Sequence, residues 1–350
     1  MSFEPVKVAL VGIGWWSEPV GAAARDCPLI DLVSCYTRTP EKRAAFAKEH
    51  GCAEAGSYEA ILEDPSIEGV LITSSNKAHQ GQVEAAFRAG KHVWVEKPIT
   101  PALATTRPVL QAWRASGKVL SVGHCYRRAA GHRKMKALIE EGAVGRPLQA
   151  EAYWATWTGQ KLTPEKWHYY REECPGGPLT QLGIHHADTL HYLLGEPVRI
   201  MGMHRRLATP AEIDDVTSTL VEHAGGAVSS IGCGFCSPNV YSLRLHGTEG
   251  VLFMQIQRVD ITNVGATDAQ TTLTFQKVGK AEAEPVALPG LPHMVYSEIE
   301  EFAVCVREGK APETGSREAA LALAVVEGSV ISSERGATVD VEELLDGMEI

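Results

Sequence analysis

The 350-residue chain lacks the long apolar run, the basic excess and the cysteine framework that mark three large classes of protein. No stretch approaches the roughly 18 apolar residues of a membrane-spanning helix. The formal net charge of −10 argues against a nucleic-acid partner, because phosphates are bound by basic surfaces. Its eight cysteines follow no regular spacing, and the N-terminus shows no secretion signal. These absences predict a cytoplasmic protein with reduced thiols and no membrane contact.

Internal repeats and low-complexity segments are absent as well. With 44% hydrophobic and 22% charged residues the composition is that of a globular protein, and the length suggests two domains. Cys233 and Cys236 have the spacing of a redox pair, but they lie in a strand-like run and no second pair completes a zinc site. We expect them to be structural cysteines.

The chain opens with a strand, a glycine turn and a helix. Residues 6–11 are almost continuously apolar, Gly12 and Gly14 follow, and residues 19–25 are helical in pattern. In this context G-x-G-x-x-G binds a pyrophosphate, although Ser17 stands at the third glycine and we expect Gly21 to supply the close helix–strand packing. Two glycines alone are equally compatible with an ordinary turn that binds no phosphate.

The second strand, residues 32–36, ends on Thr37 and Arg38. NAD-binding domains commonly place Asp or Glu here for the ribose hydroxyls. A guanidinium with a hydroxyl instead suits a 2′-phosphate, because Arg makes charge-assisted bonds to phosphate oxygens. This favours NADP and leaves NAD open, with Arg38 then an ordinary exposed loop residue.

Alternation of strands and helices continues to about residue 124. It predicts a doubly wound parallel sheet, the Rossmann fold, over residues 1–124. The strand at residues 92–96 ends on Glu96, Lys97 and Pro98. A lysine at the carboxyl edge of such a sheet lies where ligands bind, and beside a cofactor it can exchange protons near neutral pH. The alternative is a surface turn.

Gly12 and Gly14, the Asn76…His79 pair and the run from Ala89 to Pro98 together resemble the Gfo/Idh/MocA oxidoreductases. The resemblance implies an NAD(P)-dependent enzyme acting on sugars, cyclitols or related polyols, with Lys97 catalytic beside the nicotinamide and a cis Lys97–Pro98 bond. With the local reasoning above, it gives the expected cofactor-binding residues: Gly12, Gly14, Trp15, Trp16, Thr37, Arg38, Ser74, Asn76, His79, Glu96, Lys97 and Arg127.

From Leu148 the apolar period changes to two, as is typical of antiparallel strands. With the resemblance, this predicts an α+β domain over residues 125–350, with a large, mostly antiparallel open sheet that helices cover on one side. In the family the other face commonly joins subunits, which implies a homodimer or homotetramer through this sheet.

A histidine-rich helix is expected from Gln181 onward. Three interpretations compete: a metal site, a core helix with incidental histidines, and the family motif Gly-Gly-Gly-x-x-x-Asp-x-Gly-x-His-x-x-Asp. The motif makes His185 catalytic and Asp188 the acid three residues on, and no metal is expected. Gln181 stands where many members have Asp; because an amide can only hydrogen-bond, this leaves the substrate open.

Large side chains precede that helix. They either form an aromatic floor for a ring-shaped substrate or fill the domain interface. On the first interpretation the substrate-binding residues are Lys97, Tyr126, Trp157, Trp167, Gln181 and His185.

The sequence thus predicts an NADP(H)-dependent oxidoreductase that transfers hydride between nicotinamide and a hydroxyl or keto carbon of a small polyol, sugar or cyclic diol. Lys97 is the general acid/base, with His185 and Gln181 beside the reacting hydroxyl. Two alternatives keep the fold: a dehydrogenase of an aromatic cis-dihydrodiol or hydroxylated carboxylate, and a cofactor-binding regulator without turnover.

Overall fold

A computed structural model of the chain describes residues 4–257 and 269–350. It divides into two compact units, Met1–Cys125 with Pro292–Ala319 and Glu349–Ile350, and Tyr126–Leu291 with Ala320–Met348. The first unit therefore includes a late return of the chain that a single boundary at residue 124 leaves out. Among the described residues, no helix combines the length and the apolar character needed to cross a bilayer.

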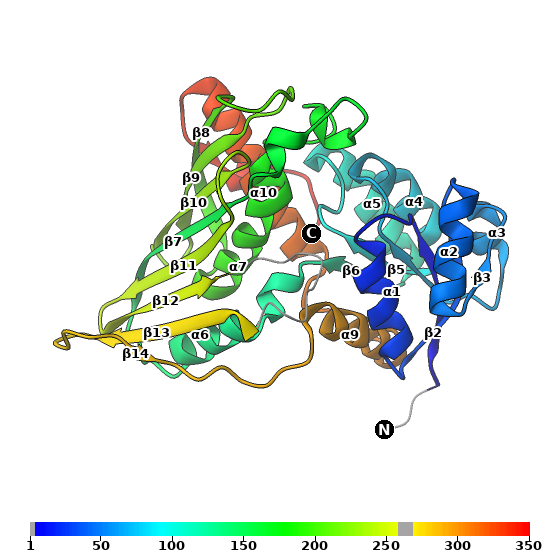
Figure 1. The fold of residues 1–350 in the computed structure, drawn as a ribbon, viewed down its shortest axis with the longest axis horizontal. Helices are drawn as coiled ribbons and strands as arrows, with labels where there is room; N and C mark the ends of the chain where they lie inside the picture. Colours follow the sequence, from blue (N-terminus) through cyan, green and yellow to red (C-terminus); the bar gives the residue numbers. More distant parts are fainter. Residues whose placement is uncertain (1–3, 258–268) are drawn as a thin grey trace. The chain divides into compact units, whose positions relative to one another are not determined.

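The first unit is built on a six-stranded parallel sheet in the order β3-β2-β1-β4-β5-β6 (Figure 1). Its strands are β1 (Val6–Val11), β2 (Ile30–Tyr36), β3 (Ala53–Glu54), β4 (Gly69–Ile72), β5 (His92–Glu96) and β6 (Leu120–Gly123). The predicted doubly wound fold is confirmed. The strand order reverses between β1 and β4, and at such a switch point the carboxyl ends of the strands leave a crevice for ligands.

Helices cover this sheet because its central strands are apolar on both faces. They are α1 (Ser17–Asp26), α2 (Pro40–His50), α3 (Tyr58–Glu63), α4 (Asn76–Arg88), α5 (Leu103–Ser116) and the returning α9 (Met294–Glu308). Helix α1 packs on α9, and α4 packs on α5. The return of α9 was not predicted, since an amphipathic pattern does not say which sheet a helix covers.

The second unit holds a nine-stranded sheet in the order β14-β13-β12-β11-β7-β10-β9-β8-β15. Its strands are β7 (Pro147–Ala155), β8 (Pro197–Arg205), β9 (Val216–His223), β10 (Val228–Gly234), β11 (Val240–Gly247), β12 (Gly250–Ile256), β13 (Thr271–Lys277), β14 (Glu284–Pro285) and β15 (Val339–Asp340). Neighbours pair antiparallel except β7 and β10, so the predicted mostly antiparallel sheet is confirmed.

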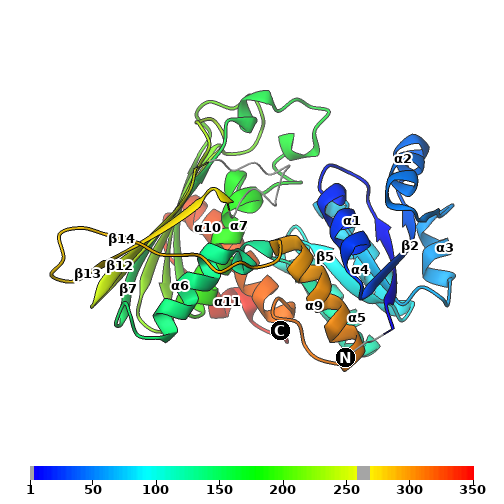
Figure 2. The same ribbon diagram turned by 60° about the horizontal axis from the view of Figure 1, so that its bottom comes forward.

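Helices α6 (Ala130–Glu140), α7 (Ile184–Leu194) and α11 (Val341–Leu345) lie on one side of this sheet, as does the part of α10 (Ser316–Arg335) that belongs to the second unit (Figures 1 and 2). The helix expected from Gln181 begins instead as a π-helical turn, η4 (Leu179–Gly183), which runs into α7. A π turn adds a residue per turn and is frequent at functional sites.

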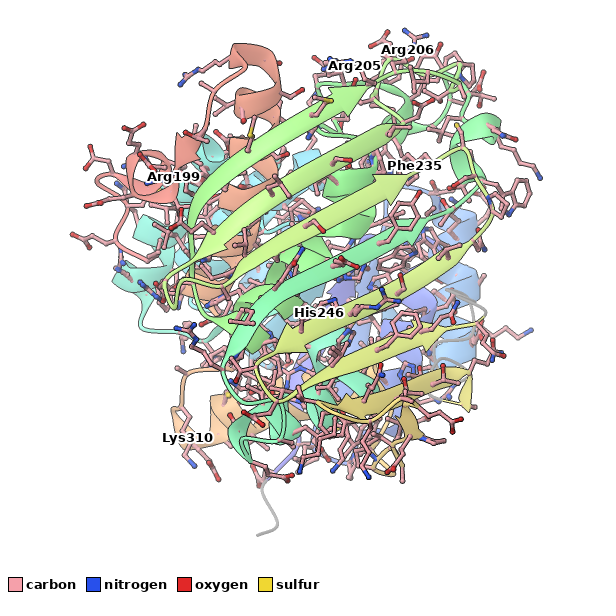
Figure 3. All side chains as sticks on the ribbon, turned by 90° about the vertical axis from the view of Figure 1, so that its left-hand side faces the viewer. Arg199, Arg205, Arg206, Phe235, His246 and Lys310 are labelled. Carbon is pink, nitrogen blue, oxygen red and sulfur yellow. The ribbon has the colours of Figure 1, made fainter. Side chains whose placement is uncertain are left out.

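The other side of the sheet faces the viewer in Figure 3, with Arg199, Arg205 and His246 at its surface. Large apolar side chains lie on the same outward positions. Met201 of β8 pairs in register with Leu220 of β9, and each is about half exposed. The outward set also includes Met203, Tyr153, Val216 and Val228. This face thus exposes several large apolar side chains among its charged ones.

Candidate active site

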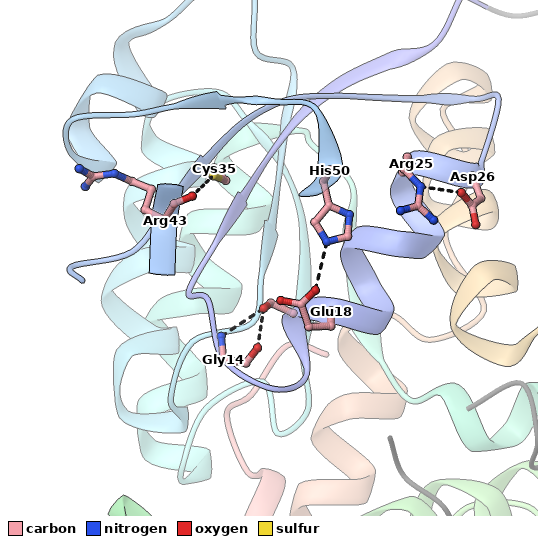
Figure 4. Close-up of polar contacts among 8 residues, drawn as sticks. Gly14, Glu18, Arg25, Asp26, Cys35, Arg43 and His50 are labelled. Atoms are coloured by element: carbon pink, nitrogen blue, oxygen red, sulfur yellow. Dashed lines mark hydrogen bonds and ion pairs between the residues drawn. The ribbon is translucent and has the colours of Figure 1, made fainter. Parts of the chain in front are cut away.

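The glycine turn after β1 has the form that a phosphate-binding turn requires. Gly12 has φ +93°, and a Cβ there would lie 2.4 Å from the backbone nitrogen of Ser74, so only glycine fits. Ser17 Oγ donates to Gly14 O at 2.6 Å and accepts from Gly14 N at 3.2 Å (Figure 4). The residue that replaces the third glycine therefore closes the turn by hydrogen bonds.

Gly21 differs from its prediction. A Cβ there would meet Phe46 and His50 of α2, so its small size serves helix–helix packing and not helix–strand packing. The same region holds Glu18, whose carboxylate lies 3.2 Å from His50 Nε2 (Figure 4).

An exposed cation follows the end of β2. Arg38 is exposed and Thr37 half-buried. Arg43 reaches back from α2, donating from Nη1 to Thr37 O at 3.3 Å and from Nε to Glu54 at 3.2 Å. Arg43 thus pairs with Glu54 at the end of β3 and also binds the backbone one residue before Arg38.

The ends of β1 and β4 have features that suit a dinucleotide. A Cβ at Gly14 would have nothing within 4 Å among the described atoms, which leaves its backbone open to a ligand. Asn76 is buried at the start of α4, and its Nδ2 has no hydrogen-bond partner in the described part of the chain. An approachable turn at a helix N-terminus and a buried, unused amide donor suit a pyrophosphate and its ribose.

The other predicted cofactor residues of this unit lie close by in the fold. Ser74 Oγ is bonded to Gln82, and His79 is enclosed between two backbone carbonyls. Trp15, more than half exposed, packs edge-on against Trp16 at the start of α1. Their contacts with a cofactor stay predictions.

Lys97 follows β5 at the carboxyl edge of the sheet, as predicted, and is half-buried. The Lys97–Pro98 peptide bond is cis, which confirms that prediction. Glu96 Oε2 accepts the Lys97 backbone N–H at 3.0 Å. Burial raises the pKa of the Glu96 carboxyl to about 7, against the lowering effect of Lys97. A carboxyl that titrates near neutral pH thus stands beside the lysine at this edge.

In the second unit Arg127 and Asp188 form a buried, two-pronged ion pair. Nε donates to Oδ2 at 2.8 Å and Nη2 to Oδ1 at 2.5 Å, and both side chains are at least 96% buried. Tyr192 flanks the guanidinium, 5.2 Å from ring centre to Cζ. Arg127 was expected at the cofactor; in this unit it neutralises Asp188, and a cofactor contact stays a prediction.

His185 is set among aromatic rings on the first turn of α7. Its ring centre lies 4.7 Å from that of Tyr126 and 5.7 Å from that of Trp154. Tyr126 in turn packs 5.5 Å from Tyr241 of β11. Three separate parts of the chain thus fix the imidazole plane by packing.

The next residue, His186, is fully buried between Trp154 and Tyr241. Burial lowers its pKa to about 3, so it is neutral at physiological pH. With Asp188 paired to Arg127, these side chains are arranged as core and ion pair, which weighs against the metal interpretation. The group of described residues whose ligand atoms do converge is Glu18, Glu49 and His50, and both glutamates there are exposed.

The remaining predicted substrate-binding residues lie in three different environments. Gln181 sits in the π turn, half-buried, and donates from Nε2 to Cys174 Sγ at 3.4 Å. Trp157 is 43% exposed with the Lys161 ammonium 3.9 Å from its ring centre. Trp167 instead packs on a small core of Cys174, Ala211, Ile213 and Phe235, and His168 stacks on it at 3.9 Å.

Two features of this site were not predicted from the sequence. Tyr241 carried no local signal, because only the register that places it opposite Trp154 brings it to the ring cluster. The pairing of Arg127 with Asp188, 61 residues apart, was also missed, although each was noted separately. Asp188, the one acidic residue of α7, was the available signal, since a buried charge needs a partner.

Comparison with known proteins places both units in one family. The family model described as oxidoreductase family, NAD-binding Rossmann fold, matches residues 6–124, and that described as GFO/IDH/MocA C-terminal domain matches residues 132–253. A 1,5-anhydro-D-fructose reductase of Ensifer adhaerens is 32% identical over 63% of this chain and 67% of its own length. A levoglucosan dehydrogenase of Pseudarthrobacter phenanthrenivorans is 29% identical over 70% of each chain.

Solved structures agree. A Desulfitobacterium hafniense protein, provisionally described as an NADPH-dependent oxidoreductase, superimposes with a TM-score of 0.94 at 32% identity, covering 98% of this chain and 100% of its own. A levoglucosan dehydrogenase bound to NADH and levoglucosan gives 0.85 at 23% identity, covering 97% and 100%, and so supports the fold alone.

Proposed function

This chain belongs to the Gfo/Idh/MocA family of nicotinamide-dependent oxidoreductases, and from that premise we propose that it is an NADP(H)-dependent oxidoreductase of a sugar, cyclitol or related polyol. The observation that carries the proposal is the placement of Lys97 at the carboxyl end of β5, on the same edge of the sheet as a glycine turn and a buried amide that suit a dinucleotide. When bound, the nicotinamide ring supplies or accepts the hydride.

Lys97 exchanges the proton of the reacting hydroxyl. Its ammonium donates to a carbonyl oxygen in reduction, and its amine accepts from the hydroxyl in oxidation. The adjacent Glu96, whose carboxyl has its pKa raised to about 7, provides a second titrating group beside it. Gly12, Gly14 and Asn76 hold the dinucleotide at the neighbouring strand ends.

His185 orients the reacting hydroxyl or relays its proton, and Gln181 hydrogen-bonds a neighbouring group of the substrate. The packing of His185 against Tyr126 and Trp154 supports this role, because a catalytic ring must be held in one orientation. Trp157, which presents an exposed ring, is suited to stack on a sugar face.

NADP is the preferred cofactor in this proposal. Arg38 is exposed at the end of β2 on a backbone that Arg43 anchors, and the nearby Glu54 is already paired. A 2′-phosphate carries a charge that a guanidinium can meet with two bonds, whereas a ribose hydroxyl is better met by a carboxylate.

A fluorescence titration with NADPH and NADH tests the cofactor preference. Arg38→Ala should weaken NADPH binding about 10- to 100-fold, the loss of a charge-assisted pair, and leave NADH binding nearly unchanged. Arg25→Ala is the matched control, since Arg25 is paired with Asp26 in the last turn of α1 (Figure 4). Equal weakening by both variants would place Arg38 outside the cofactor site.

A cyclic dihydrodiol is the second candidate substrate. The exposed ring of Trp157 and the neutral amide of Gln181 leave room for it, and a trans-1,2-dihydrobenzene-1,2-diol dehydrogenase of Oryctolagus cuniculus is 28% identical over 63% of this chain. Turnover profiles against sugars, inositols and dihydrodiols separate the two, and hydride transfer between the cofactor and any of them disposes of a non-catalytic regulator.

We also propose a homodimer or homotetramer joined through the outward face of the nine-stranded sheet. Its exposed Met201, Met203 and Leu220 form an apolar surface of the kind that subunits bury. Light scattering after size-exclusion chromatography should give a multiple of 37.8 kDa. A monomeric mass at micromolar concentration would refute the assembly.

A further inference from the structure

His79 is a fully buried imidazole enclosed by backbone carbonyls of the first unit. It lies in the first turn of α4 with no exposed surface. Nδ1 is 2.8 Å from the carbonyl oxygen of Pro98, and Nε2 is 3.1 Å from that of Ser74. With neither nitrogen reaching the surface, the ring has no atom to offer a ligand directly.

The ring is neutral under physiological conditions, because burial lowers the pKa of His79 to about 4. A neutral imidazole carries one N–H and therefore donates one hydrogen bond. We assign this proton to Nδ1, since its contact with Pro98 O is the shorter of the two. The Pro98 carbonyl is thus held by a side chain from a different strand–helix connection.

The two carbonyls around this ring belong to two different loops of the first unit, those that follow β4 and β5. Ser74 packs on the glycine turn, where a Cβ at Gly12 would come within 2.4 Å of its nitrogen. Pro98 is the residue directly after Lys97. A rigid, buried ring therefore links the loop that supports the phosphate turn to the backbone that carries the lysine.

Lys97 is held from both sides of its own backbone. Glu96 Oε2 accepts its N–H, and His79 binds the carbonyl oxygen of the following residue, Pro98. The direction of the lysine side chain depends on both restraints, because its Cα lies between them. A displacement of about 1 Å at a reacting group can cost roughly 10²-fold in rate.

We propose that His79 is a positioning residue for Lys97: its hydrogen bond to the Pro98 carbonyl fixes the lysine backbone relative to the glycine turn. The inference rests on the proposed role of Lys97. It replaces direct cofactor binding by His79 with an action through the lysine.

Two amide variants separate positioning from simple packing. His79→Asn places an N–H near the position of Nδ1, whereas His79→Gln places its amide near Nε2 and leaves the Pro98 carbonyl without that donor. We expect kcat to fall about 10²-fold in His79→Gln, with substantial recovery in His79→Asn. The dissociation constant for NADPH, measured by fluorescence, should change less than about threefold in either, because the ring is fully buried.

His92→Gln is the matched control. His92 begins β5, the strand that ends at Lys97, and its Nδ1 accepts the N–H of Val119 at 3.1 Å. The variant therefore removes a bond between a histidine and the backbone at the start of β5, far from the end of the strand that carries Lys97. We expect its kcat to stay within about threefold of wild type, and an equal loss in both glutamine variants would overturn the positioning role.

A double-mutant cycle with Lys97→Met tests whether His79 acts through the lysine. If it does, His79→Gln should add nothing to the loss already caused by Lys97→Met, since the two effects share one pathway. Additive losses would overturn the inference while leaving the proposed function standing. No loss in Lys97→Met itself would overturn both.

Competitive labelling of Lys97 with acetic anhydride, read by peptide mass spectrometry, gives a readout that needs no turnover. The labelling rate of Lys97, relative to exposed lysines, should change in His79→Gln and return toward wild type in His79→Asn. An unchanged labelling rate in His79→Gln would contradict a role in placing the lysine.

Discussion

Lys97 and His185 are held by different means. Lys97 stands at a strand end, where its own N–H donates to Glu96 Oε2 and His79 binds the carbonyl oxygen of Pro98. His185 stands on a helix, and its neighbours are the rings of Tyr126 and Trp154.

The difference shows how each site tolerates change. Hydrogen bonds to backbone carbonyls are local and directional, so a site built on them depends on a few donors. A site built on packed rings depends on the shape of the whole cluster. We therefore expect single polar substitutions to act on rate in the first unit, and loss of a buried charge or ring to act on stability in the second.

Breaking the ion pair of Arg127 with Asp188 should have the largest effect on stability. Arg127→Met leaves a fully buried carboxylate without its partner, which typically costs about 3–5 kcal/mol. The free energy of unfolding from urea denaturation measures this. Adding Asp188→Leu should recover part of the loss, because two apolar side chains leave no buried charge.

Arg244→Met provides the control for the loss of an arginine. Arg244 pairs with Glu151 at 3.8 Å, and both side chains are nearly half exposed. Such a pair contributes less than about 1 kcal/mol. If the two arginine variants were equally destabilised, the second unit would not depend on its buried pair.

Neighbouring histidines of α7 allow a matched comparison. His185→Phe keeps a ring for Tyr126 and Trp154 but removes both nitrogens, so turnover should fall about 10²-fold with little change in melting temperature. His186→Phe should leave turnover within about threefold, because that ring is enclosed by Trp154 and Tyr241. Similar rates in both variants would remove His185 from the reaction.

His186 should also make the protein sensitive to acid. Its pKa is about 3 in the folded state, below the usual 6.5, so between these values the unfolded chain binds more protons. Stability therefore rises with pH across this window and is lost on acidification. In His186→Phe the decrease in unfolding free energy from pH 6.5 to 4.5 should be smaller by about 2 kcal/mol. If His186→Phe left the pH dependence of the unfolding free energy unchanged, His186 would not be a buried neutral base.

The same contrast explains what could be predicted from sequence. The sheet of the first unit and the placement of Lys97 followed from apolar runs that end on glycines or on Glu96, Lys97 and Pro98, because such signals are local. The cis bond followed from the family resemblance.

The rest depended on contacts between distant parts of the chain. Strands β8 and β12 were not predicted, and neither was the addition of α9 to the first sheet. Gly21 was expected to pack on a strand and instead faces Phe46 and His50, a choice set by the angle between two helices. The neighbours of His185 come from β7 and the segment after β6, which no spacing rule brings together.

The central claim is that Lys97 exchanges the proton of the reacting hydroxyl, and one measurement tests it most directly. The rate of hydride transfer is compared between wild type and Lys97→Met at saturating NADPH, with the dissociation constant for NADPH measured on the same samples. We predict a loss of about 10²–10⁴-fold in rate with nearly unchanged cofactor binding, the effect of removing a general acid/base. An unchanged rate in Lys97→Met would contradict the account.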